Sequence, residues 1–273
     1  MSVSTAHEFD PGPVAEPFAS LAREYPGTDA YPAASFRVEW GPIFHRGRLD
    51  GSARLLVIGQ DPAASESIVR RILVGAAGHR TQGLMAKLGI DRSYLLVNTF
   101  LYSVYGQQGG EQHAGDQQIA AYRNRWLDAI FASNSIGAVL ALGHLADGAW
   151  QAWRKTANGK SHSPPYEHVT HPTEPDSASG GDPVQLAAAT QAMLTNWNEA
   201  LARLYPLAHA DRQAPLVAYG TSFKPQELVE IPECDVPAGL PEWMRSPAGW
   251  ATRAGSSAIA KRHNITITIP AGS

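Results

Sequence analysis

RLLVIGQDPAA, residues 54–64, is the stretch of this sequence that decides its fold. Its first five residues form a short apolar run that ends at a glycine, which is typical of a strand buried on both faces. The polar Gln60 and Asp61 follow the run directly. Three similar runs occur further along the chain and are predicted to be strands: Tyr94–Asn98, Ile136–Leu142 and Glu167–Thr170.

Segments with helical spacing or composition separate and follow these runs. Strands that alternate with helices predict a parallel sheet covered on both faces. We therefore expect an α/β fold, a three-layer α/β/α sandwich around a central four-stranded parallel sheet, plus a C-terminal extension. Asp116 is expected to cap one helix and Pro183 to begin another. The expected helices are Ser67–Val74, Thr81–Leu88, Asp116–Ser133, His144–Lys155 and Pro183–Tyr205.

The chain divides into three stretches by composition. Residues 1–50 are rich in proline and aromatic residues, and we expect a wrapping segment with a short helix near Val14–Glu24. Residues 51–205 form the α/β core. Residues 206–273 form an extension packed on the core, in which short strands are predicted at Leu216–Tyr219, Leu228–Ile231 and Asn264–Ile269. The extension has a basic end, with no acid after residue 243 and with Arg245, Arg253, Lys261, Arg262 and His263.

Composition excludes several classes of protein. Of 273 residues, 44% are hydrophobic and 17% are charged, so the chain buries a core. A net charge of −3 excludes a protein that coats nucleic acid by bulk charge, although a local basic groove is compatible with it. The single cysteine, Cys234, excludes an internal disulfide and a site made of several thiolates. Without an apolar run of about 18 residues or a signal-peptide pattern, we expect a cytoplasmic protein.

Polar side chains stand at the ends of the predicted strands. Asp61, Asn98 and His171 each follow or end an apolar run. Ligands of parallel sheets bind beyond the carboxyl ends of the strands. Taken singly, Asp61 fits a turn former, Asn98 fits a residue that satisfies a loop backbone, and His171 fits an ordinary loop histidine. Together they favour an active site with a carboxylate, a carboxamide and an imidazole.

Three motifs resemble those of the uracil-DNA glycosylase superfamily: GQDPAA (59–64), LLVNTFLYSV (95–104) and THPTEP (170–175). Residues 74–92 are similar to the thermophilic, iron–sulfur branch of that family. VLALGHLADGAW (139–150) resembles the loop and helix that grip phosphate in it. The resemblance covers about residues 51–205, and the C-terminal extension has no counterpart in it.

The resemblance implies a monofunctional DNA repair glycosylase that flips uracil out of DNA and hydrolyses its N-glycosidic bond, leaving an abasic site. Asp61 would stabilise the cationic sugar and orient the water. His171 would donate, as a neutral imidazole, a hydrogen bond to uracil O2 as negative charge develops there. Asn98 would read the base, because its amide can donate to O4 and accept from N3–H, a pattern that cytosine reverses.

The resemblance also implies a binding surface for uracil-containing DNA, on a protein expected to be a monomer and, in a prokaryote, associated with the nucleoid. Base contacts are expected from Gln60, Asn98, Leu73 and Phe100, and DNA phosphate contacts from Gly143, His144, Ser163 and Thr173.

The sequence departs from the family at several positions. Ala63 and Ala64 replace the tyrosine and histidine that follow GQDP. Leu73 stands where the thermophilic branch stacks a phenylalanine on uracil, and Phe100 is the alternative stacking residue. The leucine that wedges into the duplex has no clear equivalent, because residues 174–182 form a Ser- and Gly-rich loop. The four cysteine ligands of the iron–sulfur branch are absent, so no metal and no cofactor is expected.

Other functions remain open at this point. A nucleotide-binding α/β enzyme is weakened because no P-loop and no GxGxxG are present, and a serine hydrolase because GxSxG is missing. A relative that traps an abasic sugar covalently would use a histidine such as His113, whose usual basic neighbours are missing here. Action on another deaminated base and a non-catalytic DNA-binding module are the remaining alternatives.

Overall fold

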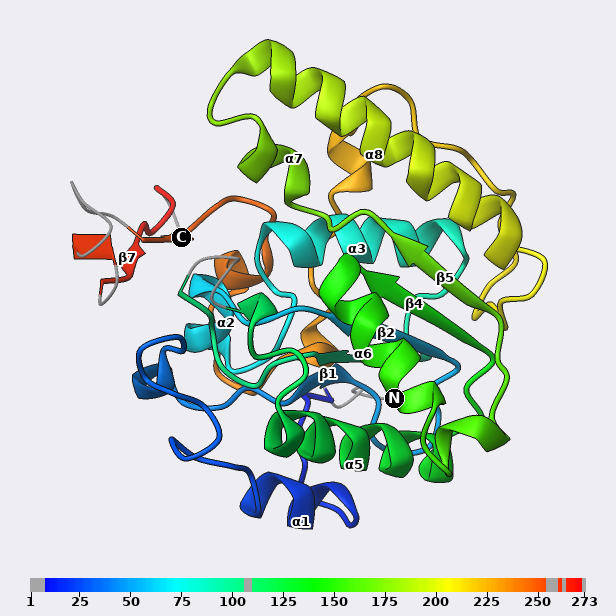
Figure 1. Cartoon of the computed structure of the whole chain (residues 1–273). Helices are drawn as coiled ribbons and strands as arrows, with labels where there is room; N and C mark the ends of the chain where they lie inside the picture. The colour runs from blue at the N-terminus through cyan, green and yellow to red at the C-terminus, as the bar shows by residue number, and fades with distance from the viewer. Residues whose placement is uncertain (1–7, 106–109, 254–259, 262–263, 272–273) are drawn as a thin grey trace, which may run out of the picture.

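The computed structural model describes residues 8–105, 110–253, 260–261 and 264–271. They form a mixed α/β structure around a five-stranded sheet with the strand order β1-β3-β2-β4-β5 (Figure 1). The four predicted strands are confirmed as parallel neighbours: β2 (Leu55–Gly59), β3 (Tyr94–Asn98), β4 (Ala138–Leu142) and β5 (Tyr166–Val169).

The predicted number of four strands is wrong, because a short strand completes the sheet at one edge. This strand, β1 (His45–Gly47), runs antiparallel to β3. It contains no apolar run that would mark it as a strand. Its residues are nevertheless buried, since Arg46 forms an ion pair with Asp235 and His45 Nε2 lies 3.3 Å from Asp10 Oδ2.

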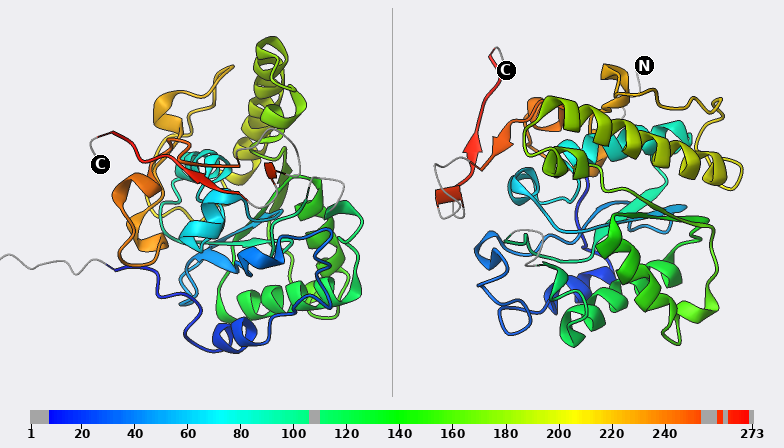
Figure 2. Two further views of the ribbon diagram at one scale, coloured as in Figure 1. Left: turned by 90° about the vertical axis from the view of Figure 1, so that its left-hand side faces the viewer. Right: turned by 45° about the horizontal axis from the view of Figure 1, so that its top comes forward.

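Helices lie on both faces of the sheet (Figures 1 and 2). Along β2, Leu56 and Ile58 join one hydrophobic cluster, and Leu55 and Val57 join another on the opposite face. The first cluster includes α5 (Gln117–Ser133), α6 (His144–Arg154) and the short α1 (Phe18–Arg23). The second includes α3 (Ala76–Lys87) and α8 (Pro183–Leu204).

Two loops differ from the prediction near the carboxyl edge of the sheet. Helix α2 (Ala64–Val69) begins and ends earlier than expected, because Arg70 and Leu73 adopt positive φ values of 62° and 52°. The predicted loop after residue 173 contains a short helix, α7 (Glu174–Ala178). Asp116 precedes α5, but its side chain makes no cap and pairs with His113 instead.

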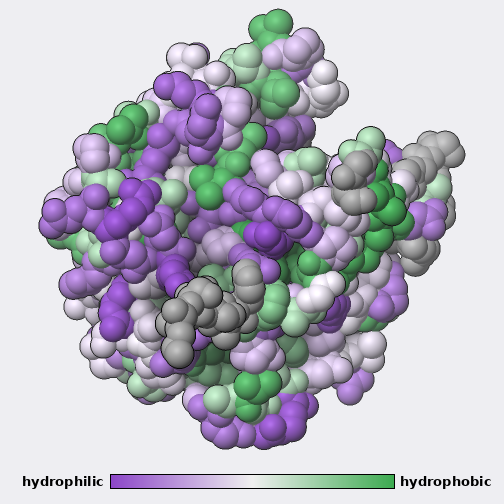
Figure 3. Space-filling model, turned by 180° about the vertical axis from the view of Figure 1, so that it is seen from behind, coloured by the Kyte–Doolittle hydropathy of each residue, from purple (hydrophilic) through white to green (hydrophobic). Residues whose placement is uncertain are grey.

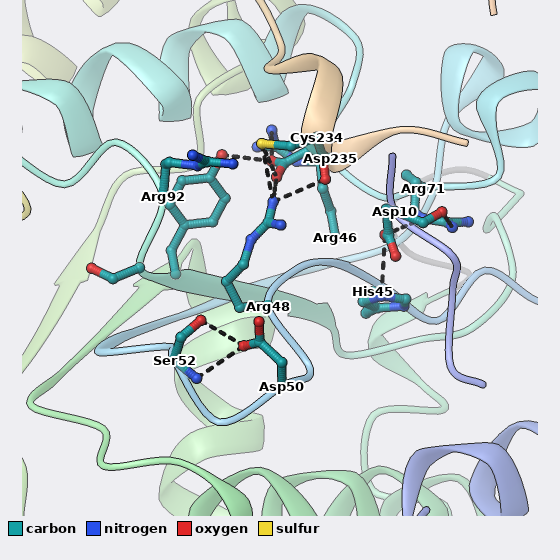
Figure 4. Close-up of polar contacts among 12 residues, drawn as sticks. Asp10, His45, Arg46, Arg48, Asp50, Ser52, Arg71, Arg92, Cys234 and Asp235 are labelled. Atoms are coloured by element: carbon teal, nitrogen blue, oxygen red, sulfur yellow. Dashed lines mark hydrogen bonds and ion pairs between the residues drawn. The ribbon is translucent and has the colours of Figure 1, made fainter. Parts of the chain in front are cut away.

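The C-terminal extension is fixed to the core by a buried acid. Asp235 accepts hydrogen bonds from Arg46 at 3.1 Å, from Arg48 and from the Tyr94 hydroxyl at 2.5 Å (Figure 4). Beside it, the Val236 carbonyl accepts the backbone N–H of Asp10, so the N-terminal segment meets the extension there. Asp235 has no exposed surface, and these contacts tie both ends of the chain to strands β1 and β3.

Two predicted strands of the extension are wrong. Residues 216–219 and 228–231 have no regular secondary structure and cover helices instead, since the rings of Tyr219 and Phe223 pack on Trp197. Strand β7 (Thr266–Ile267) lies within the third predicted strand and pairs with β6 (Ala251–Thr252). The described part of the chain also contains 3-10 helices at Val38–Trp40, Gly159–Ser161, Pro225–Glu227, Glu233–Asp235 and Glu242–Arg245.

The surface seen from behind is hydrophilic over much of its left and centre (Figure 3). In the described part of the chain, no helix combines the length and apolar character needed to cross a membrane. Two parts of the sequence-based predictions lie outside the described residues. They are Arg262 and His263 of the basic end and residues 1–7, where no signal peptide was expected.

Candidate functional site

The predicted polar residues meet at the carboxyl edge of the sheet, where two glycines allow their side chains to approach. Gly59 pairs with Asn98 across β2 and β3. A methyl group on Gly59 would collide with Asn98 Oδ1 and would lie 3.5 Å from Leu73 Cδ1. A methyl group on Gly143, after β4, would lie 2.5 Å from Gln60 Nε2 and 3.0 Å from His171 Cβ. Asn98, Gln60 and His171 therefore lie along one continuous edge.

Asp61 presents a carboxylate at this edge. Its Oδ2 accepts the backbone N–H of Val104 at 2.9 Å, and no hydrogen bond to Oδ1 is found among the described residues. Burial raises the pKa of Asp61 to about 6, against the opposing effects of the Val104 hydrogen bond and the positive charge of Arg37. At neutral pH the carboxylate is therefore ionised in most molecules, with one oxygen fixed.

Arg37 supports the backbone group that holds Asp61. This side chain is only 3% exposed, and its Nη1 donates to Ser103 Oγ at 3.0 Å and to the Val104 carbonyl. Its guanidinium also lies over the Tyr105 ring, 4.4 Å from the ring centre. The N-terminal segment thus contributes to the geometry of the site. The sequence contained no motif that marks Arg37.

Glu66 is a second residue that sequence reasoning missed. It is 4% exposed and accepts three backbone N–H groups: Ala63 at 3.1 Å, Val74 at 2.8 Å and Gly75 at 3.0 Å. These bonds join the turn after Asp61 to the loop in which Leu73 adopts its positive φ. Its bond to the Ala63 N–H is one half of a capping box, but Ala63 has no side-chain oxygen to complete the motif, so no sequence signal marked Glu66.

Asn98 is the residue whose hydrogen bonding is incomplete. Its side chain lies in a position that is 9% exposed, and neither Oδ1 nor Nδ2 has a partner among the described residues. Leaving a buried amide unpaired costs roughly 1–3 kcal/mol for each group. Asn98 therefore does not satisfy a loop backbone, and its donors and acceptor are available to a ligand.

His171 is a neutral hydrogen-bond donor. Its Nδ1 accepts the backbone N–H of Thr173 at 3.3 Å, which leaves the ring proton on Nε2. Burial, together with the positive charge of Arg80 and the proximity of His144, lowers the pKa of His171 to about 4. The imidazole is therefore uncharged at neutral pH.

The loop that carries His171 is held from two sides. Arg80, on α3, donates to the Pro172 carbonyl at 2.6 Å and to Asp176 Oδ2 at 2.5 Å. On the other side, α8 fixes Thr170, because Asn196 Oδ1 accepts its N–H at 2.8 Å and the Trp197 indole donates to its carbonyl at 2.9 Å. The sequence analysis identified none of these three supporting side chains.

One predicted DNA phosphate contact lies away from the carboxyl edge of the sheet, and another lies in the site beside His171. Ser163 precedes β5 and so lies at the amino edge of the sheet, opposite His171; the prediction did not consider on which side of the strand it stands. Thr173 lies in the site, but its N–H and hydroxyl face His171 Nδ1 at 3.3 and 3.2 Å. Gly143 and His144 begin α6 at the expected edge, where His144 Nε2 lies 3.1 Å from Glu111 Oε1.

Phe100 does not present a ring face for stacking. It has no exposed surface, because its side chain packs in the core against Phe36, with 5.4 Å between ring centres. The assumption that Phe100 continues the face of Asn98 fails since β3 ends at Asn98. Leu73, beside Gly59, is the predicted base contact that the structure places next to Asn98.

His113 is engaged at both ring nitrogens. Nδ1 lies 2.6 Å from Asp116 Oδ2, and Nε2 lies 3.0 Å from Ser35 Oγ. Among the described residues, no group of three or more histidine, cysteine or acidic side chains has the arrangement of a metal site. At the carboxyl edge of the sheet, Asp61, Asn98 and His171 each offer a polar group to a substrate.

Comparison of the chain with protein-family models and with curated proteins finds no match. The site must therefore be interpreted from its own geometry and chemistry.

Proposed function

We propose that this chain is a DNA repair glycosylase that flips uracil out of DNA, hydrolyses its N-glycosidic bond and leaves an abasic site. In this proposal its core is the three-layer α/β/α sandwich of the uracil-DNA glycosylase superfamily. The observation that supports it most is the unpartnered, buried carboxamide of Asn98 on the edge that also carries a carboxylate and a neutral imidazole.

Asn98 gives the proposed site its selectivity. Uracil offers an acceptor at O4 and a donor at N3–H, which match the amide NH₂ and the carbonyl oxygen of an asparagine. Cytosine offers a donor and an acceptor at the same positions, so it would leave buried groups unpaired. Leu73 lies beside the carboxamide and provides an apolar contact for the base.

Asp61 and His171 act on opposite ends of the breaking bond. As the bond between C1′ and N1 breaks, the sugar becomes cationic and the base leaves as an anion. The Asp61 carboxylate stabilises the cation and orients the water whose oxygen bonds to C1′. The Nε2–H of His171 donates to uracil O2 and stabilises the anion without transferring its proton.

DNA contacts outside the pocket are part of the proposal. The backbone N–H of His144 begins an eleven-residue helix and suits a phosphate, whereas the N–H of Gly143 already donates to the Val169 carbonyl at 2.8 Å. The positive charge of Arg253, in the extension, is one of the effects that oppose the rise in the pKa of Asp61 caused by burial. This arginine is therefore part of the electrostatic surroundings of the site. We expect a monomer that acts on DNA in the cytoplasm, and in the nucleoid of a prokaryote.

A relative that traps abasic sugar covalently is less well supported. Such a protein needs a histidine nitrogen free to attack the sugar. Both ring nitrogens of His113 lie within 3.0 Å of a side-chain oxygen. Action on another deaminated base remains the alternative, because Ala63 and Leu73 differ from the family residues that define its base pocket.

One assay tests the proposal. A labelled oligonucleotide containing uracil is incubated with the protein, treated with alkali and run on a denaturing gel. We expect strand scission at the uracil, and a roughly hundred- to thousand-fold lower rate for His171→Ala with DNA binding retained. His168→Ala is the matched control, because this histidine lies on β5, three residues before His171, and its side chain is 41% exposed.

Three outcomes would contradict the proposal. A protein–DNA band that survives denaturation would indicate trapping. DNA binding without release of free base would indicate a binding module. Equal losses of activity and stability in His171→Ala would assign the imidazole to the fold.

A further inference from the structure

A small cavity lies inside the core, between α5 and the end of β3. Its volume is about 20 Å³, and its wall includes Thr99, Tyr31, Arg123 and Trp126. These four residues are between 1% and 5% exposed. Asn98 also contributes to the wall, although its side chain lies near Leu73 in the cluster on the other face of the sheet. The cavity therefore borders the candidate active site on the α5 side of the sheet.

Arg123 is a buried cation without a counter-ion in the described part of the chain. Its Nε and Nη1 have no hydrogen-bond partner there, and no carboxylate forms an ion pair with it. Burial lowers its pKa to about 10, so the guanidinium is still protonated at neutral pH. A buried charge needs compensation by an opposite charge or by several hydrogen bonds.

The other polar groups of the wall are also mainly donors. The Trp126 indole N–H is buried and has no hydrogen-bond partner in the described part of the chain. The Tyr31 oxygen accepts the N–H of Leu101 at 3.5 Å, which leaves its own proton to be donated. The Tyr122 hydroxyl donates to the Leu21 carbonyl at 2.6 Å. Donors therefore outnumber acceptors, and an occupant of the cavity has to accept hydrogen bonds.

We propose that this cavity binds a single halide ion, chloride under cellular conditions, against the Arg123 guanidinium. A space of about 20 Å³ exceeds the roughly 10–15 Å³ that one water molecule needs, and it fits one monatomic ion. Carboxylate, phosphate and sulfate are too large. A water molecule would bring two protons into a wall that is already rich in donors, and it would not neutralise the charge. A halide accepts from every donor and supplies the missing charge.

The ion would stabilise the fold next to the candidate site. Val97 and Thr99 contribute to the cavity wall, and they flank Asn98 in the sequence. An ion held between this strand end and α5 would fix the backbone from which the Asn98 side chain projects. The proposed ion site does not depend on the proposed glycosylase activity, because its stabilising effect is measured without DNA.

Thermal unfolding in two salts of equal ionic strength tests the inference. Sodium chloride is compared with sodium acetate, whose anion does not fit the cavity. Raising chloride from about 5 to about 500 mM in exchange for acetate should raise Tm by about 4–5 °C, if the ion binds only the folded state and is half-bound at or below the lower concentration. Arg123→Met should remove this dependence.

Arg125→Met is the matched control. This arginine lies on the same helix two residues further on, is 49% exposed and pairs with Glu24 at the surface. It loses the same charge without changing the cavity, so its response to chloride should match that of the parent. Equal Tm values of the parent in the two salts, or an equal response in all three proteins, would overturn the inference.

A second measurement uses the parent alone and so does not require Arg123→Met to fold. Crystals grown in sodium bromide should give an anomalous peak for bromide beside Arg123 Nε and Nη1. Density for a water molecule only, without anomalous signal, would show that the occupant is neutral and would overturn the inference.

Discussion

Replacing Asp61 by asparagine is expected to stabilise the folded protein at neutral pH. Asparagine keeps an oxygen that accepts the Val104 N–H, so the hydrogen bond at 2.9 Å is retained. It removes the buried negative charge, which the folded state disfavours. If Asp61 is instead a turn former whose carboxylate supports the fold, the same substitution should destabilise the protein.

The size of the effect follows from the pKa. Burial raises the pKa of Asp61 from 3.8 to about 6, which corresponds to at most about 3 kcal/mol in the free energy of unfolding. Because the folded state binds the proton more tightly, the parent loses this stability as the pH rises from about 4 to about 6. The advantage of Asp61→Asn should therefore be absent near pH 4 and constant above about pH 7.

Urea unfolding between pH 4 and 8 measures this difference. Asp50→Asn is a control in which the pKa shift has the opposite direction. Burial alone would raise the pKa of Asp50, but the hydrogen bonds from Ser52 outweigh it and hold this pKa below its usual value. That variant should lose stability at neutral pH. If Asp61→Asn is less stable than the parent at pH 8, or if its advantage does not change with pH, the reasoning is refuted. If Asp61→Asn is more stable than the parent but cleaves uracil more slowly, the carboxylate of Asp61 serves function and not stability.

Three further predictions concern the site and its surroundings. Asn98→Asp should lower discrimination against cytosine, because a protonated carboxyl group matches the cytosine pattern; unchanged selectivity at full activity, measured on paired oligonucleotides, would exclude base reading by Asn98. Arg80→Met should raise the pKa of His171 from about 4 towards its usual value, as followed by NMR titration, whereas an unchanged pKa would limit Arg80 to holding the loop. Replacing Arg253, Lys261 and Arg262 of the basic end by alanine should reduce the slope of log binding constant against log salt concentration by about 1 for each phosphate contact that is lost. A slope equal to that of the parent would indicate that these residues form a solvated surface.

The sequence was most informative where the physics is local. The apolar runs before Gly59 and up to Asn98 predicted two central strands, because strands buried on both faces need continuous apolar side chains. The edge strand was missed for the opposite reason. Its Arg46 is buried only because Asp235, far along the chain, pairs with it. No local pattern contains that information.

The same contrast holds in the candidate site. Asp61, Asn98 and His171 were found because each stands at the end of a strand. The groups that hold them were not, since Arg37, Arg80 and Glu66 act through backbone atoms of distant loops. Ser163 was misplaced because composition does not tell on which side of a short strand a residue lies. The apolar residues 216–219 were misread since they cover a helix.

The contacts of Asp235 have a consequence for how the protein is made. Arg46, Arg48 and Tyr94 leave the ribosome long before Asp235, and until it follows them two guanidinium groups at the edge of the sheet have no carboxylate. During synthesis the nascent chain therefore exposes an unfinished edge, and such edges are prone to wrong pairing. Closing contacts between residues nearly 190 positions apart is also slow, because a long loop must be ordered first. A chain that stops before Asp235 would keep its active-site motifs but should depend on chaperones to avoid aggregation.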